Sequence, residues 1–241
     1  MTALKIESDA VEVRAGRSDA KVLVTCEHAS QRMPEGWAWP ERDRRLVDTH
    51  WAYDLGAADM ARDFAAAMGA AVVLSRYSRL LVDPNRPEDS DTLFRTHAEG
   101  ETVELNTTHL HAEERARRVQ RLLRPYHATL DEEVAASRAP TLVSIHTFTP
   151  VYEGQPRTLE VGVLYDRDEA LAERVAQVLV KAGLNAALNE PYSGKEGLMY
   201  AVDRHARAHG RQSIEFEVRQ DLATDPAFRR DFDALLLEIF G

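Results

Sequence analysis

Cysteine is almost absent from this chain of 241 residues, since Cys26 is the only one. An internal disulfide needs two cysteines and a cysteine-based zinc cluster needs several, so both are excluded. A single cysteine fits a protein of a reducing compartment.

Long apolar runs are also absent. No stretch reaches the roughly 18 apolar residues of a membrane-spanning helix. The first residues, MTALKIESDAVEV, carry charges where a secretory signal peptide needs an apolar core. We therefore expect a cytoplasmic protein with no membrane partner.

Basic side chains are the minority among the charged ones, with 30 Lys and Arg against 40 Asp and Glu and a formal net charge of -10. Such a charge repels nucleic acid and anionic membranes at long range, so neither is an expected partner. Because 44% of the residues are hydrophobic, the chain can bury a sizeable core.

Several sequence motifs are missing as well. There is no Gly-rich phosphate loop, no Gly-x-Ser-x-Gly elbow and no Cys-nucleophile motif, which argues against nucleotide binding and covalent acyl transfer. No Pro-, Gly- or Ser-rich linker divides the chain, so residues 1–241 are predicted to form a single domain. Metal-dependent chemistry is the remaining route to catalysis.

Short apolar segments alternate with helical patterns along the chain. The predicted strands are KVLVTCEHAS, AAVVLSRY, RLLVD, TLVSIHTFTP, TLEVGVLYD, LNAALNE and SIEFEVRQDL. The predicted helices cover 48–68, 111–136 with a kink near Pro125, 169–181, 200–209 and 225–240. This alternation predicts an α/β fold, a three-layer domain with a mostly parallel central sheet that binds ligands beyond the carboxyl ends of its strands.

Two histidines, His28 and His146, lie at the carboxyl ends of two such strands. Neutral imidazole is the commonest ligand of catalytic zinc, which usually has three protein ligands and one water. We predict His50 as the third ligand, because it opens the helix predicted from Asp48 and has Asp54 one turn later to orient it. The alternative is that these are structural histidines and an exposed polar helix face.

Two carboxylates, Glu215 and Glu217, alternate with apolar residues on the last predicted strand, so both point to the same face. A buried carboxylate needs a cation, an arginine or a metal-bound water beside it. One of the two is therefore a candidate general base, unless the strand is an edge strand with a solvated face.

A polar cluster follows the RLLVD segment, formed by Arg79, Asp83, Asn85 and Arg86. A planar guanidinium beside an amide can hold a substrate carboxylate through several hydrogen bonds. These residue types are also common in turns, so a loop without a binding role is the alternative.

Taken together, CEHAS, DTHWAYDLGA, SRLLVDPNRP, PYH, SIHTF and IEFEVRQDL resemble the ordered motifs of the N-formylglutamate amidohydrolases, in the CEHAS-type branch of that family. The resemblance covers most of the chain. It implies a fold akin to zinc carboxypeptidases and aspartoacylase, also called phosphorylase/hydrolase-like.

The resemblance also implies roles for single residues. His28 and His146 would bind zinc, Glu217 would be the base and Arg79 would polarise the scissile carbonyl. Asn85 and Arg86 would hold the substrate carboxylate, helped by Arg219 or Lys195.

One departure leaves the remaining ligand open. Gln31 stands where those relatives carry a glutamate ligand. His50 is then the expected ligand, with Asp48 or Asp54 as alternatives.

The expected activity is therefore zinc-dependent hydrolysis of N-formyl-L-glutamate or a similar small N-acyl amino acid. A zinc peptidase, another N-acyl amino acid deacylase and a non-catalytic carboxylate-binding protein of the same fold are the alternatives.

Overall fold

The computed structural model describes residues 5–241, and eight strands of this part of the chain form one sheet. These strands are β1 (Lys5–Glu7), β2 (Val11–Arg14), β3 (Val22–Cys26), β4 (Ala71–Ser75), β7 (Thr141–Phe148), β10 (Val161–Leu164), β11 (Ala186–Leu188) and β12 (Gln212–Arg219). Their order across the sheet is β1-β2-β4-β3-β7-β12-β10-β11.

The centre of this sheet is parallel, which confirms the predicted α/β architecture. Strands β4, β3, β7 and β12 run side by side in the same direction. Antiparallel pairing occurs toward the edges, where β2 pairs with β4 and β10 pairs with β12. The two N-terminal strands, β1 and β2, were not predicted.

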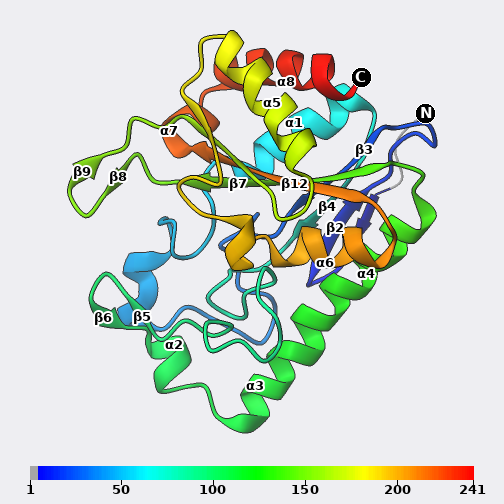
Figure 1. Cartoon of the computed structure of the whole chain (residues 1–241). Helices are drawn as coiled ribbons and strands as arrows, with labels where there is room; N and C mark the ends of the chain where they lie inside the picture. The colour runs from blue at the N-terminus through cyan, green and yellow to red at the C-terminus, as the bar shows by residue number, and fades with distance from the viewer. Residues whose placement is uncertain (1–4) are drawn as a thin grey trace.

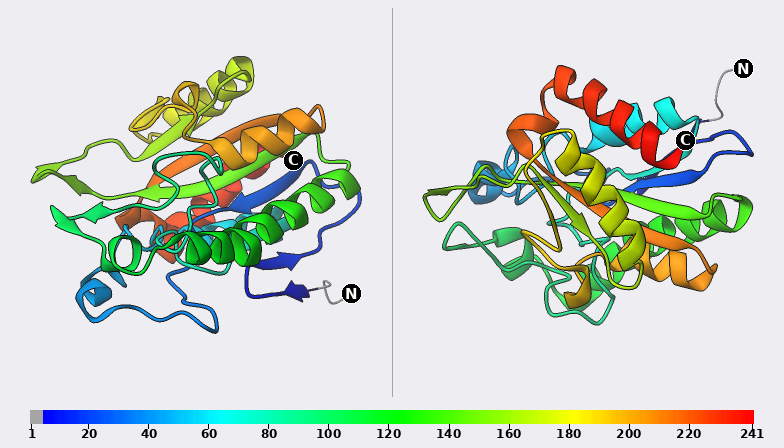
Figure 2. Two further views of the ribbon diagram at one scale, coloured as in Figure 1. Left: turned by 90° about the horizontal axis from the view of Figure 1, so that it is seen from below. Right: turned by 45° about the horizontal axis from the view of Figure 1, so that its top comes forward.

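Helices cover both faces of the sheet. On one face lie α1 (Ala57–Met68), α5 (Glu169–Lys181) and α8 (Pro226–Phe240), and on the other lie α4 (Arg124–Ala136) and α6 (Tyr200–Ala208) (Figures 1 and 2). The first group packs Phe64 and Phe232 into one apolar cluster, and the second packs Tyr126 and Val202 into another. Because the central strands are covered on both faces, they are buried almost throughout, and β3 and β4 are mainly apolar.

Shorter elements connect these layers. They are two 3₁₀ turns (Glu41–Leu46 and Gly194–Glu196), α2 (Glu104–Thr107), α3 (Ala112–Arg118), α7 (Gln220–Ala223) and two hairpins, β5 (His97–Ala98) with β6 (Glu101–Thr102) and β8 (Val151–Tyr152) with β9 (Gln155–Pro156). The β8–β9 hairpin directly follows β7. Both hairpins extend from the end of the sheet at which β7 finishes (Figures 1 and 2).

The helices predicted over 169–181 and toward the C-terminus are confirmed by α5 and α8, whose N-cap Asp225 accepts a hydrogen bond from the backbone of Ala227. The predicted kink near Pro125 is a π-helical turn at Val119–Leu123 between α3 and α4. Pro125 lies just after this turn inside a helix that continues from α3, so the π-helical turn is where the helix accommodates the N–H that proline lacks.

The helix predicted from Asp48 is wrong in its first nine residues. The structure begins α1 at Ala57, after Gly56 in a left-handed conformation with φ 83°. A side chain at Gly56 would also collide with Ala223. The preceding segment is held instead by long-range bonds, since Asp54 N–H donates to the carbonyl of His28 at 2.9 Å.

The RLLVD segment was predicted as a strand and is a turn. Its residues Leu80, Leu81 and Val82 are buried in a third apolar cluster, which explains the apolar pattern without a strand. Among the helices of residues 5–241, none combines the length and apolarity that crossing a membrane requires.

Candidate active site

The carboxyl ends of three central strands bring together the residues singled out in the sequence. His28 follows β3, His146 lies near the end of β7, and Glu217 lies opposite His146 in the register of β12 against β7. All three line one cavity of about 460 Å³. Parallel strands end at the same edge of a sheet, so residues far apart in sequence meet there.

The two imidazoles share one carboxylate, that of Asp54. Its Oδ2 lies 3.3 Å from Nδ1 of His28 and 2.8 Å from Nδ1 of His146. One ligand atom from each of the three residues lies within 4.8 Å of the other two. Two imidazole nitrogens and one carboxylate oxygen are a donor set that suits zinc with a further position open.

Each histidine has a second carboxylate on its other nitrogen. Nε2 of His28 lies 2.7 Å from Oδ1 of Asp83, and Nε2 of His146 lies 3.0 Å from Oε2 of Glu27. Carboxylates in this position fix the tautomer and the ring orientation of metal-binding histidines. Both Nδ1 atoms are thereby directed toward Asp54.

Glu27 was missed by the sequence reasoning, although it stands inside the CEHAS motif. It is fully buried and accepts hydrogen bonds from Tyr126 Oη at 2.9 Å and Ser144 Oγ at 2.6 Å. Burial alone would raise the pKa of Glu27, but its bonds with His146, Ser144 and Tyr126 lower the pKa to about 2. A charged residue directly after a buried strand was the available signal.

A second set of potential ligands overlaps the first, formed by Glu27, His146 and Glu215. Glu27 does not line the cavity, and both of its carboxylate oxygens already accept hydrogen bonds. The set of His28, Asp54 and His146 faces the cavity instead. Only this first set offers an ion an open position for substrate.

Glu215 and Glu217 both reach the cavity, as their shared strand face predicted. Burial raises the pKa of Glu215 to about 7 and raises that of Glu217 well above its usual value. One oxygen of each carboxyl group is buried without a hydrogen-bond partner among the described residues. Glu215 faces inward, with Oε2 3.5 Å from Nε2 of His146, while Glu217 is the more exposed of the two, at 6% against 1%.

The predicted arginine and asparagine cluster also borders the cavity. Arg79 forms ion pairs with Asp54 at 3.3 Å and Asp83 at 3.1 Å. The Asn85 amide accepts from Ala201 N–H and donates to the Leu198 carbonyl, both at 2.9 Å, so it fixes the start of α6.

With this geometry in view, comparison with known proteins identifies the family. The family model for N-formylglutamate amidohydrolases matches residues 20–224. The chain belongs to the N-formylglutamate amidohydrolase family. An N-formylglutamate deformylase of Pseudomonas putida is 30% identical over 221 residues, which cover 83% of this chain and 80% of that protein.

Two crystal structures resemble this family member over nearly its whole length. A gene product of Agrobacterium tumefaciens is 30% identical, with a TM-score of 0.85 over 96% of this chain and 93% of that one. The N-formylglutamate amidohydrolase of Ralstonia eutropha is 21% identical, with a TM-score of 0.70 over 96% of this chain and 97% of that one. At this lower identity the likeness shows a shared fold.

Three of the candidate residues lie apart from the histidine pair in this N-formylglutamate amidohydrolase family member. His50 lines the cavity but packs against Trp51, with ring centroids 4.6 Å apart and ring planes tilted by 37°, and does not join the set around Asp54. Asp48 is exposed and does not line the cavity. The structure does not bring Arg219 to the cavity, because its guanidinium pairs with Asp221 and donates to the carbonyls of residues 157–159.

Two further arginines, Arg95 and Arg157, line the cavity and were not singled out in the sequence. Arg95 lies over the Trp51 ring at 5.1 Å, and Arg157 lies among aromatic rings near the β8–β9 hairpin. No sequence signal marked them, because neither belongs to a quoted motif.

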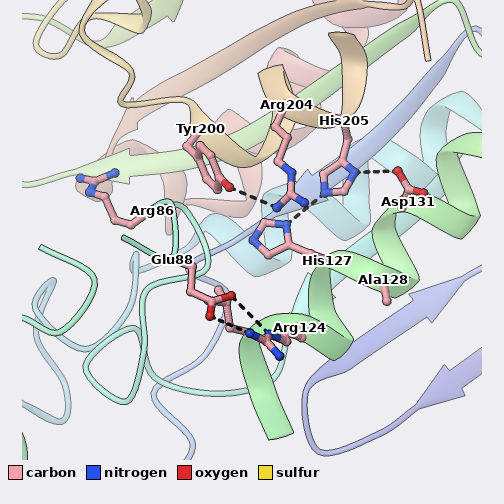
Figure 3. A pocket seen from close by; sticks show the side chains of 10 residues that line it. Arg86, Glu88, Arg124, His127, Ala128, Asp131, Tyr200, Arg204 and His205 are labelled. Atoms are coloured by element: carbon pink, nitrogen blue, oxygen red, sulfur yellow. Dashed lines mark hydrogen bonds and ion pairs between the residues drawn. The ribbon is translucent and has the colours of Figure 1, made fainter. Parts of the chain in front are cut away.

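Arg86 borders a second cavity of about 430 Å³ as well. There Nδ1 of His127, the histidine of the PYH motif, lies 3.0 Å from Nε2 of His205. Nδ1 of His205 in turn lies 3.2 Å from Oδ1 of Asp131. Figure 3 shows this chain of side chains and, apart from it, the guanidinium of Arg86. Arg86 donates to the Asn85 carbonyl, and no described carboxylate forms an ion pair with it.

Proposed function

We propose that this protein is a zinc-dependent amidohydrolase that cleaves N-formyl-L-glutamate, or a closely similar N-acyl amino acid, to the free acid and the amino acid. The observation that carries the proposal is the position of Asp54 between the Nδ1 atoms of His28 and His146, inside a cavity that also holds Glu217. The family and the names of the relatives support the substrate class.

His28, His146 and Asp54 would hold the zinc ion. Asp54 takes the place expected of His50, because its carboxylate already contacts both imidazoles. Bound there, zinc would polarise the scissile carbonyl and lower the pKa of a water molecule. Asp83 and Glu27 would keep both rings in the required orientation.

Glu217 would move the proton in the reaction. As water adds to the acyl carbon, the carboxylate accepts one proton from it and passes it to the amide nitrogen, so the C–N bond breaks and a neutral amine leaves. Burial raises the pKa of the Glu217 carboxyl group, and a cation bound at the histidines would favour the carboxylate form that accepts the proton.

The arginines would orient the substrate. Arg79 fixes Asp54 and Asp83, and an N–H not used in these ion pairs would stabilise the developing oxyanion. Arg86 would bind the α-carboxylate, since its guanidinium has no carboxylate partner among the described residues. Asn85 would support this loop rather than contact substrate, because its amide is fully engaged.

Metal analysis and a substrate screen test this function. Protein purified without added zinc should contain about one zinc per chain and should hydrolyse N-formyl-L-glutamate faster than N-acetyl or peptide substrates. Asp54→Ala should lose zinc and activity, whereas His50→Ala should retain zinc. Zinc-free wild-type protein, or full zinc occupancy in Asp54→Ala, would contradict the proposal.

A further inference from the structure

Arg157 is held in place through its backbone at the base of the β8–β9 hairpin. Its N–H donates to the Pro150 carbonyl at 2.8 Å, and its own carbonyl accepts from Arg219 at 3.2 Å. Arg219 also binds the next two carbonyls, those of Thr158 and Leu159. The Arg157 side chain takes no part in these hydrogen bonds.

The guanidinium of Arg157 lies among three aromatic rings. Its Cζ is 4.7 Å from the centroid of Tyr152, 5.3 Å from that of Phe148 and 5.9 Å from that of Tyr192. The Nη1 atom is buried and has no hydrogen-bond partner among the described residues. A buried N–H group of a cation without an acceptor is costly, so this atom favours an incoming anion.

The cavity is lined by paired and unpaired arginines. Arg79 is neutralised by Asp54 and Asp83. In the described part of the chain, Arg157 has no ion-pair partner, and neither do Arg86 and Arg95. The cavity thus offers more than one site for a carboxylate.

The position of Arg157 fits the outer part of a substrate. Arg86 directly follows Asn85 on the loop after Asp83 and lines the same cavity. Tyr152 and Tyr192 beside Arg157 are 55% and 38% exposed, which places this group at the mouth of the cavity. Their rings offer apolar surface for methylene groups, and the guanidinium offers a fork for the carboxylate at the end of such a side chain.

We propose that Arg157 is the specificity-determining residue for an acidic side chain, binding the side-chain carboxylate of the N-acyl amino acid while Arg86 binds its α-carboxylate. This inference rests on the proposed function for the nature of the substrate. It adds the residue that selects one amino acid over another.

Arg157→Met tests the inference, because methionine keeps the apolar contacts with the rings and removes the charge. N-formyl-L-glutamate and N-formyl-L-glutamine have the same shape and differ in the side-chain charge. The variant should lose about 10- to 100-fold in kcat/KM for the glutamate substrate, as expected for one charged hydrogen-bonded contact, with little change for the glutamine substrate. The kcat/KM of Arg157→Lys for the glutamate substrate should lie between those of wild-type protein and Arg157→Met, since lysine keeps the charge and lacks the guanidinium fork.

Arg95→Met is the matched control, since Arg95 is the other unpaired arginine that lies over an aromatic ring of the cavity. If Arg95→Met abolishes the preference for glutamate and Arg157→Met does not, the inference is overturned. An equal loss on both substrates in Arg157→Met would also overturn it, because a merely structural arginine acts in that way.

Calorimetric binding of the same two ligands separates this inference from the proposed function. In the slow-turnover Glu217→Gln background, protein with Arg157 should bind N-formyl-L-glutamate more tightly, and the double variant with Arg157→Met should bind both ligands alike. If the preference depends on Arg157 but no N-formyl amino acid is hydrolysed, the proposed function fails and the inference stands. If wild-type protein hydrolyses both ligands at the same kcat/KM and the Glu217→Gln protein binds both equally, the inference fails and the function stands.

Discussion

At the scale of single residues, Glu215 and Glu217 share one strand face and still have different surroundings. Glu215 lies against Nε2 of His146, the same nitrogen that contacts Glu27. Glu217 is the more exposed of the two and lies closer to the open cavity. The charge of His146 lowers both pKa values, but burial outweighs it in each case. This difference in exposure supports the proposal that Glu217 transfers the proton and that Glu215 has a supporting position.

Glu217→Gln should therefore reduce kcat strongly and leave binding nearly intact. Glutamine keeps the shape and cannot accept a proton, so the loss expected for general acid–base catalysis is about 10²- to 10⁴-fold. KM and zinc content should change little, which steady-state kinetics and metal analysis can measure.

Glu215→Gln is the control for this variant and should retain more activity. If Glu215→Gln is the inactive protein and Glu217→Gln turns over normally, the two roles are exchanged. If both variants keep full activity, neither carboxylate transfers the proton and the hydrolytic mechanism must be abandoned.

At the scale of elements, β10 supports the site from the side opposite to β7. Gly162 pairs with Glu217 in the antiparallel register of β10 and β12. A side chain at Gly162 would overlap the Glu190 carbonyl and approach the Cβ of Glu217 to 3.3 Å. The absence of a side chain there lets the segment that carries Tyr192 pass close over the strand.

Gly162→Ala should displace this segment. Overpacking of a filled site costs about 1–3 kcal/mol, and each kcal/mol lowers the Tm of a domain of this size by about 2–4 °C. The Tm should thus fall by about 2–12 °C, and KM should rise because Tyr192 and Glu217 both line the cavity. Differential scanning calorimetry and substrate kinetics would show both effects.

Gly183→Ala is the control for Gly162→Ala, because it separates steric crowding by the added methyl group from backbone strain. Gly183 has φ 93° and no atom within 4 Å of an added Cβ, so alanine there strains the backbone and displaces nothing. Its Tm should fall while its KM stays unchanged. A similar rise in KM in this variant would show that the effect at Gly162 is not local to the cavity.

At the scale of the whole molecule, the proposed zinc site joins three parts of the chain that already contact each other. Asp54 contacts both imidazoles directly, and Arg79 forms ion pairs with Asp54 and Asp83. The apolar clusters on the two faces of the sheet are independent of this site. The fold should therefore survive removal of the metal, in contrast to a small zinc-dependent domain.

Chelation should lower the Tm and leave the circular dichroism spectrum of the folded protein unchanged. A ligand present at 100 times its dissociation constant stabilises the native state by about 2.7 kcal/mol. At about 2–4 °C for each kcal/mol, the shift is about 5–11 °C. Unfolding at room temperature on chelation, or an unchanged Tm, would contradict this expectation.

The sequence by itself determined the regular framework and the residues attached to it. Runs of β-branched and apolar residues fix the strands locally, and parallel strands end at one edge of the sheet, so His28, His146 and Glu217 could be expected to meet. The same alternation placed both carboxylates of the last strand on one face. The single domain over residues 1–241 and the cytoplasmic location stay predictions.

Only the tertiary structure decided which residues of the irregular segments reach the site. Asp54 rather than His50 lies between the imidazoles because a hydrogen bond to the distant His28 carbonyl shapes that segment, where periodicity predicted a helix. Arg219 holds the backbone carbonyl of Arg157, and Glu27 finds its partners Tyr126 and Ser144 at 99 and 117 residues further along the chain. Sequence periodicity reflects local backbone geometry. The conformation of a loop depends instead on distant residues that the fold brings into contact with it.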